Sequence, residues 1–366
     1  MTKVYFVLFL SGMLFANSFI VEEIAANDSA QQEQVITGNG FIAAVVQTTD
    51  HDEVKCERAH QTDTHTANGI LLSLDNGKTW QHNLLKEYRV NFLQLGDGGS
   101  VVAVTADNRY IQISLRDVKA PGEKVDFLHF PPTKSKKSPK WGPVLNDIMS
   151  HEVDFNNYDD LVTLAHETSH GIHSHIRNKM NKTGKTANGF YVLNNRAVVV
   201  VEPNMRKSKV AKYVPPSLRG SRYYTYVSGA PSWDDRPLYI WDEWNAYVNG
   251  SEAGIDLVDN DLWKYGWRDA VAGTLEFVVY SIAVAMAAKE HDPQYFNNYD
   301  QFREFLAWNV KRSMELYRKG AKIEHFKYEK QEKYYKDMQT SPDAEQFRQF
   351  CRELFGGTWT EQNLGF

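Results

Sequence analysis

The chain has 366 residues, of which 42% are apolar and 13% aromatic, which is enough for a sizeable buried core. This composition argues against a disordered chain, and the length allows two domains of the usual roughly 100–200 residues. The 41 basic and 46 acidic side chains give a net charge of -5, without the basic excess typical of nucleic-acid-binding proteins. We therefore expect a globular protein with no nucleic-acid partner.

Residues 1–18 have the pattern of a signal peptide. Lys3 precedes an almost wholly apolar run over positions 4–16, and small residues follow at 16–18. A retained membrane anchor is the alternative, because the apolar run continues to Val21. In both interpretations the remaining chain faces the outside of a membrane, so we expect a secreted, periplasmic or cell-surface protein.

The segment 34–120 predicts a β-rich domain. Short apolar runs, as at 41–46, 70–74 and 101–104, alternate with turns rich in Gly, Asn and Asp. Residues 73–80, SLDNGKTW, resemble the Asp-box, a β-hairpin turn repeated in sialidase-like and other β-propellers. The motif occurs once and the segment is too short for a propeller, so we expect a folding element within a small β-sandwich or blade-like fragment.

The rest of the chain predicts a linker and a helical domain. Residues 121–142 form the expected linker, because Pro and Lys gather at 131–140. Residues 143–366 predict a strand at 196–201 and helices at 158–177, 240–248, 269–290, 301–318 and 322–337. The run at 269–290 is nearly apolar enough to span a bilayer, but Glu276 favours a buried core helix, so no span is expected after signal removal. The expected fold class is α+β, a small all-β domain followed by a mostly helical one.

The helix expected at 158–177 carries the residues suited to chemistry. His166 and His170 are four positions apart, so a helix places both imidazoles on one face, where both can bind one metal ion. Glu167 follows the first histidine and can take a proton from a water on that ion. Four of the 12 histidines fall between 166 and 175, which argues against scattered surface histidines.

The sequence of residues 166–170, HETSH, resembles the HExxH signature of the zincin metallopeptidases. The metzincin extension is absent, because His173 and Ile176 stand where that pattern requires Gly and His. Residues 239–247, YIWDEWNAY, resemble the helix that supplies the glutamate ligand in gluzincin-type peptidases, which makes Glu243 the third ligand. Other candidates for the third ligand are Asp242, Glu276, His173 and His175.

The resemblance covers two short segments and implies a two-lobed zincin-like catalytic domain at 143–366. It implies a Zn²⁺ ion held by His166, His170 and Glu243, and a zinc-bound water that attacks a peptide bond with Glu167 as general base. The expected activity is that of a zinc metallopeptidase, with a peptide or protein as substrate.

Four further residues are candidates for the same site. Tyr239 and Tyr224 are candidates for stabilising the developing oxyanion, since both lie near Glu243 in sequence. Arg222 is a candidate for binding a substrate carboxylate, with pairing to nearby acidic residues as the alternative. His173 is a candidate for lining the substrate cleft, with a solvent-exposed position as the alternative.

Two other functions remain open. One is a cell-wall (peptidoglycan) amide hydrolase acting on a cell-wall peptide, with the polymer held by the β-rich domain. The other is a non-catalytic carbohydrate- or protein-binding module with a structural metal, which would have no need of Glu167. Cys56 and Cys351 are either bridged or separate buried thiols, and the absence of a CxxC motif excludes a thiolate zinc site.

Overall fold

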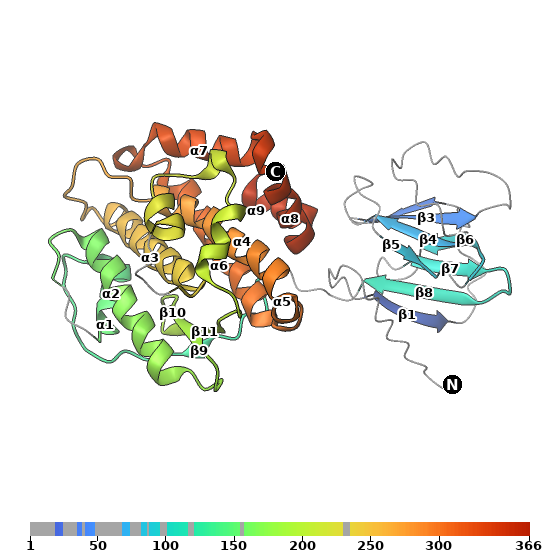
Figure 1. The fold of residues 1–366 in the computed structure, drawn as a ribbon, viewed down its shortest axis with the longest axis horizontal. Helices are drawn as coiled ribbons and strands as arrows, with labels where there is room; N and C mark the ends of the chain where they lie inside the picture. Colours follow the sequence, from blue (N-terminus) through green and yellow to red (C-terminus); the bar gives the residue numbers. More distant parts are fainter. Residues whose placement is uncertain are drawn as a thin grey trace. The chain divides into compact units, whose positions relative to one another are not determined.

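The computed structural model describes residues 19–24, 35–38, 41–47, 68–73, 82–85, 88–95, 101–115, 121–153, 157–229 and 235–366. The chain divides into two compact units, Met1–Val118 and Lys119–Phe366 (Figure 1). Strands make up the described part of the first unit, and helices dominate the second, so the fold class is α+β. The predicted signal peptide, the Asp-box turn at 74–80 and Cys56 lie outside the described residues.

The first unit contains two four-stranded antiparallel sheets. One has the order β1 (Phe19–Ile24), β8 (Tyr110–Leu115), β7 (Val101–Thr105) and β6 (Val90–Leu95). The other has the order β2 (Val35–Gly38), β3 (Phe41–Gln47), β4 (Asn68–Ser73) and β5 (His82–Leu84). Ala43 and Ile70 from the second sheet share an apolar cluster with Leu93, Ala103 and Ile111 from the first. The two sheets therefore bury one common core.

The second unit contains a three-stranded antiparallel sheet, in the order β10 (Ala187–Tyr191), β11 (Arg196–Val201) and β9 (Leu128–His129). The strand predicted at 196–201 is confirmed as β11. Strand β9 lies within the segment expected as a linker, and the backbone N–H of Gly122 donates to Glu304 Oε2 at 2.8 Å. Residues 121–142 therefore pack as part of the second unit.

Helices form most of the second unit. The long ones are α2 (Leu161–His175), α3 (Tyr239–Asp259), α4 (Ala272–His291) and α6 (Asp300–Gly320). The shorter ones are α1 (Gly142–Ser150), α5 (Pro293–Asn298), α7 (Glu329–Thr340), α8 (Glu345–Phe355) and α9 (Gly357–Leu364). Short segments of other helix types are the π-helical η2 (Ile176–Met180) and η5 (Tyr224–Ser228) and the 3₁₀-helical η3 (Lys207–Tyr213), η4 (Pro216–Leu218), η6 (Glu324–Phe326) and η7 (Pro342–Ala344).

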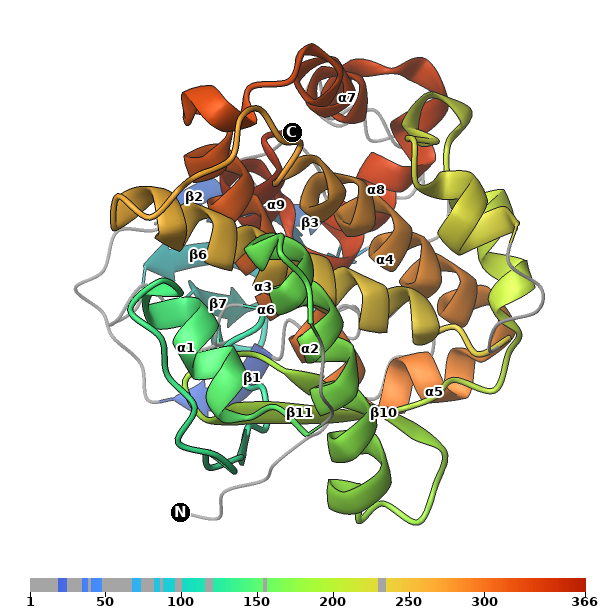
Figure 2. The ribbon, with the colours of Figure 1, turned by 90° about the vertical axis from the view of Figure 1, so that its left-hand side faces the viewer.

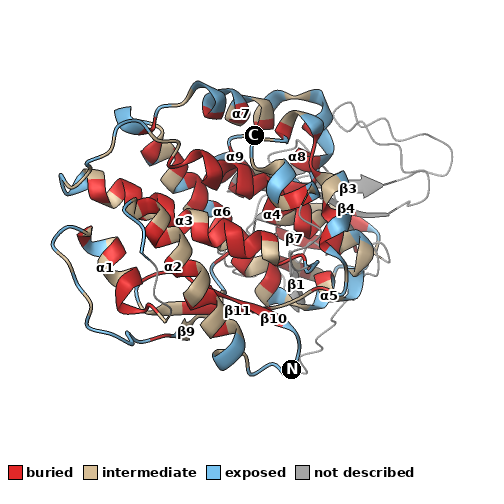
Figure 3. Cartoon of the chain, turned by 60° about the vertical axis from the view of Figure 1, so that its left-hand side comes forward, coloured by how far each residue is buried: buried red, intermediate tan, exposed pale blue. Residues whose placement is uncertain are grey.

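Helix α4 lies in the core of the second unit. Within the described residues it is the one helix long and apolar enough to cross a membrane, and 89% of its apolar window is buried. Figure 3 shows buried residues along most of its length. The core helix predicted at 269–290 is therefore present.

Helices α2 and α3 pack directly against each other (Figure 2). Gly250 of α3 makes this approach possible, since a Cβ at that position would lie 3.2 Å from the carbonyl oxygen of Val162 and 3.5 Å from Cβ of His166. Gly254, one turn later, lies against the side chain of Val162 in the same way. This close packing brings the His-rich helix next to the acidic start of α3.

Candidate metal centre

Helix α2 positions two histidines side by side. Asp160 caps the helix, because its side chain accepts hydrogen bonds from the backbone N–H groups of Val162 and Thr163. The helix then runs without interruption to His175, so His166 and His170 lie one turn apart on one face. Their Nε2 atoms are 3.1 Å apart.

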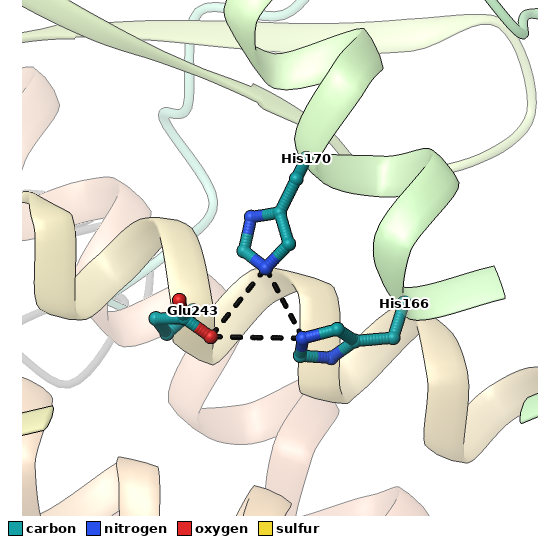
Figure 4. Close-up of side chains that lie close together, drawn as sticks. All are labelled: His166, His170 and Glu243. Carbon is teal, nitrogen blue, oxygen red and sulfur yellow. Dashed lines mark hydrogen bonds and ion pairs between the residues drawn. The ribbon is translucent and has the colours of Figure 1, made fainter. Parts of the chain in front are cut away.

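Helix α3 adds a carboxylate to this pair. Glu243 Oε2 lies 3.6 Å from Nε2 of His166 and 3.4 Å from Nε2 of His170. Figure 4 shows the three side chains converging from the two helices. Glu243 is buried, and its Oε2 has no hydrogen-bond donor among the residues that the structure describes.

These three atoms could hold a metal ion. Tetrahedral bonds of about 2.0–2.2 Å, as in zinc sites, set ligand atoms about 3.3–3.6 Å apart. The two separations that involve Glu243, 3.4 and 3.6 Å, agree with that spacing, and the 3.1 Å between the two histidine nitrogens is slightly shorter. A buried carboxylate oxygen without a donor is costly, and a cation at this position would compensate it.

Asp242 and Tyr239 make hydrogen bonds to the atoms of His170 and Glu243 that point away from the centre of the cluster. Asp242 Oδ1 lies 2.8 Å from Nδ1 of His170 and 2.7 Å from Nδ1 of His173. The Tyr239 hydroxyl donates to Glu243 Oε1 at 2.8 Å. These are hydrogen-bond distances, shorter than the spacing between metal ligands. Asp242 therefore orients His170 by a hydrogen bond and is not itself one of the three converging atoms of His166, His170 and Glu243.

The electrostatics of the cluster favour a positive charge at its centre. Burial opposes a charge on His170, but the hydrogen bond with Asp242 and the nearby carboxylate of Glu243 overcome this effect and raise its pKa well above the usual value. Burial likewise opposes a charge on Glu243, yet the nearby imidazoles of His166 and His170 lower its pKa to about 2. In the metal-free cluster a proton on His170 therefore takes the place of a cation.

The other predicted site residues lie in different surroundings. Glu167 is half-buried on α2, and its role as general base stays a prediction. Tyr224 lies in η5 with 76% of its surface exposed. His173 is fully buried and hydrogen-bonded to Asp242, so it neither lies at the surface nor lines an open cleft.

Arg222 and the remaining candidate ligands have their own partners. The Arg222 guanidinium pairs with Asp269 at 2.7 Å and with Glu276 at 3.0 Å, so both terminal nitrogens are engaged. Glu276 therefore belongs to an ion pair outside the metal cluster. The ring of His175 packs near that of Phe130, with centroids 5.9 Å apart, and is also outside the cluster.

Two asparagines near the site were missed by sequence reasoning. Asn245 Nδ2 lies 3.0 Å from Nε2 of His173, and Asn249 donates to the hydroxyl of Ser169 at 3.0 Å. The available signal is their spacing after Asp242, at three and seven positions, which places all three on one face of α3.

Comparison of the chain with protein-family models, with curated proteins and with solved structures finds no match. Conclusions about function therefore depend on the site itself. Two imidazoles and one carboxylate, with a glutamate next to the first imidazole, can bind a metal ion and leave a position open for a reacting molecule.

Proposed function

We propose that this chain is a zinc-dependent hydrolase that cleaves peptide bonds as a metallopeptidase. The observation that carries the proposal is the convergence of Nε2 of His166, Nε2 of His170 and Oε2 of Glu243 at 3.1–3.6 Å. Two nitrogens and one oxygen suit zinc, whereas calcium and magnesium prefer ligand sets made of oxygen. Three protein ligands leave a fourth position free, as in catalytic rather than structural zinc sites.

Each residue of the site then has a distinct role. When bound, zinc supplies a Lewis acid that polarises a carbonyl and makes water a nucleophile at neutral pH. Glu167 takes the proton of that water and delivers it to the leaving amine. Tyr239 orients the ligand carboxylate, since its hydroxyl donates to Oε1 while Oε2 of Glu243 faces the histidines.

The choice of substrate rests on two features of the sequence. HETSH at 166–170 and the Glu243 helix resemble zincin peptidases, and residues 1–18 have the pattern of a signal peptide. Together they support a peptide or protein substrate outside the cell. The Arg222 guanidinium already binds two carboxylates, which makes it a poor choice for anchoring the substrate.

The test combines metal content with activity in three forms of the full chain: the wild type, His166→Ala and Glu167→Gln. Elemental analysis gives the metal, and a mixed library of fluorescence-quenched peptides gives the hydrolysis rate. We expect about one zinc per chain in the wild type and in Glu167→Gln, and none in His166→Ala. Glu167→Gln should lower kcat about 10²–10⁴-fold, because the proton acceptor is lost while the metal stays.

Two results would contradict the proposal. A wild-type chain that takes up no zinc would refute the proposal that the protein is a zinc-dependent hydrolase. Zinc binding without hydrolysis of any peptide in the library would instead favour a binding module with a structural metal.

A further inference from the structure

We propose that His173 is a positioning residue of the metal centre, which acts through Asp242 to fix the proton of His170 and present its Nε2 lone pair to the metal. The proposal deepens the proposed function and rests on it. It follows from a chain of hydrogen bonds that begins at the backbone of β10 and ends at the metal-facing nitrogen.

The first link fixes the amide of Asn245. The carbonyl oxygen of Tyr191, at the end of β10, can only accept hydrogen bonds. It lies 2.6 Å from Nδ2 of Asn245 and 3.0 Å from Nδ2 of Asn249. A reversed Asn245 amide would place its oxygen against this carbonyl oxygen, so Nδ2 faces Tyr191.

The second link fixes the tautomer of His173. The same Nδ2 of Asn245 lies 3.0 Å from Nε2 of His173, and an amide nitrogen only donates, so this Nε2 is an acceptor. A neutral imidazole then carries its proton on Nδ1, which donates to Asp242 Oδ1 at 2.7 Å. His173 is fully buried, and both of its ring nitrogens are engaged within the protein, by Asp242 and Asn245.

The third link reaches the metal ligand. Asp242 Oδ1 also lies 2.8 Å from Nδ1 of His170, so this nitrogen donates and carries the proton. The other nitrogen of His170, Nε2, is therefore the one that would give its lone pair to a bound metal, and it lies 3.4 Å from Glu243 Oε2 and 3.1 Å from Nε2 of His166. A carboxylate behind a ligand imidazole fixes the ring and makes its free nitrogen a better donor to the metal.

His173 is needed because Asp242 has a competing partner. Arg177 lies 3.6 Å from Asp242 Oδ2 and is less buried than the histidines. The hydrogen bond from His173 Nδ1 keeps Oδ1 of Asp242 directed at His170. Without it, the carboxylate can turn toward the guanidinium, and the His170 ring loses its fixed orientation.

The first experiment determines the proton on His173 without any metal. The full chain is labelled with ¹⁵N-histidine, stripped of metal, and studied by long-range ¹H–¹⁵N NMR, with His173→Asn used to assign the His173 signals. We expect His173 in the Nδ1–H form. An Nε2–H form of His173 would overturn the relay, and this readout does not depend on zinc or on hydrolysis.

The second experiment measures zinc affinity by competition with a chelator. We expect the affinity to fall about 10–100-fold in Asp242→Asn and in His173→Leu, as for other partners of ligand histidines. His173→Asn is the matched control, because its amide nitrogen can donate to Asp242 from near the place of Nδ1. It should keep affinity within about threefold of the wild type, a rescue that a residue acting only by filling space would not show.

The outcomes separate the two proposals. Wild-type affinity in His173→Leu, or an equal loss in His173→Leu and His173→Asn, would overturn the positioning role of His173 while leaving the zinc hydrolase intact. A wild-type chain without zinc affinity would overturn the proposed function, whereas the NMR result tests the relay in that case as well.

Discussion

Two buried glutamates on neighbouring core helices have opposite surroundings. Glu243 on α3 and Glu276 on α4 are exposed to nearly the same small extent, 6% and 7%. Each oxygen of Glu276 has two donors within the protein. Oε1 accepts from the hydroxyl of Ser221 and from Arg222 Nη1, both at 3.0 Å, and Oε2 accepts from the backbone N–H of Arg222 and the hydroxyl of Tyr280, both at 2.9 Å.

Only one of the two carboxylate oxygens of Glu243 has a hydrogen-bond donor among the described residues. Its Oε1 accepts from Tyr239, while its Oε2 faces the Nε2 atoms of His166 and His170 and has no donor among the described residues. Burial by itself does not separate a structural carboxylate from a metal ligand. The count of donors on each oxygen does, because an oxygen that the fold leaves without a donor needs a cation from outside.

The largest expected effect comes from removing each glutamate in turn. Glu243→Ala should abolish stoichiometric zinc binding, because it removes one of three ligands. Glu276→Ala should keep one zinc per chain but lower the free energy of unfolding by about 3 kcal/mol, since it leaves Arg222 buried with one acid fewer. Urea unfolding of metal-free protein, beside elemental analysis, checks both. Loss of zinc from a folded Glu276→Ala chain would contradict the assignment of Glu276 to a structural role outside the metal site.

A second effect is the dependence of zinc affinity on pH. The hydrogen bond with Asp242 and the nearby carboxylate of Glu243 raise the pKa of His170 well above its usual value despite burial, so zinc must displace its proton at neutral pH. Affinity should therefore rise with pH by about tenfold per unit for each proton released, and level off above the pKa of His170. Chelator competition at pH 6, 7 and 8 measures this, and a flat profile would show that His170 carries no proton to displace.

The smallest effect is expected from the two tyrosines that serve these glutamates. Tyr239→Phe removes the donor to Glu243 Oε1 and should lower zinc affinity about tenfold. Tyr280→Phe removes a donor to Glu276 and should leave zinc affinity unchanged, at a loss of about 1 kcal/mol in unfolding free energy. The same two assays apply. A larger loss of zinc affinity in Tyr280→Phe than in Tyr239→Phe would contradict the assignment of Glu243 as the zinc ligand and of Glu276 as a structural residue.

The sequence predicted most of the elements that carry this site. Helix α2 was expected at 158–177 and runs over Leu161–His175, because its apolar spacing and its cap are local properties. The approach of His166 to His170 follows from helix geometry alone. The sequence also indicated Glu243 as the third ligand, by its likeness to a known ligand helix, and the structure brings it to the two histidines.

Long-range partners could not be predicted from local patterns. Asp242 and Glu276 were open alternatives to Glu243 because all three are acidic residues on helices. The rotation of α3 against α2 separates Asp242 from Glu243, whereas Glu276 is set apart by its place on α4 beside Arg222. Arg222 was weighed against acidic residues close to it in sequence, but it pairs with Asp269 and Glu276 on a later part of the chain. His173 was expected near solvent, because helical spacing does not show which face α3 will cover.

The candidate ligands come from two helices that meet at Gly250, so an ion held by all three would join α2 to α3. Such an ion would have two bonds to α2, through His166 and His170, and a third to α3, through Glu243. On the α3 side, the hydroxyl of Tyr239 holds the carboxylate of Glu243 by its hydrogen bond to Oε1. Because such an ion would bind the folded state and join two helices, it would oppose local opening of the chain between α2 and α3.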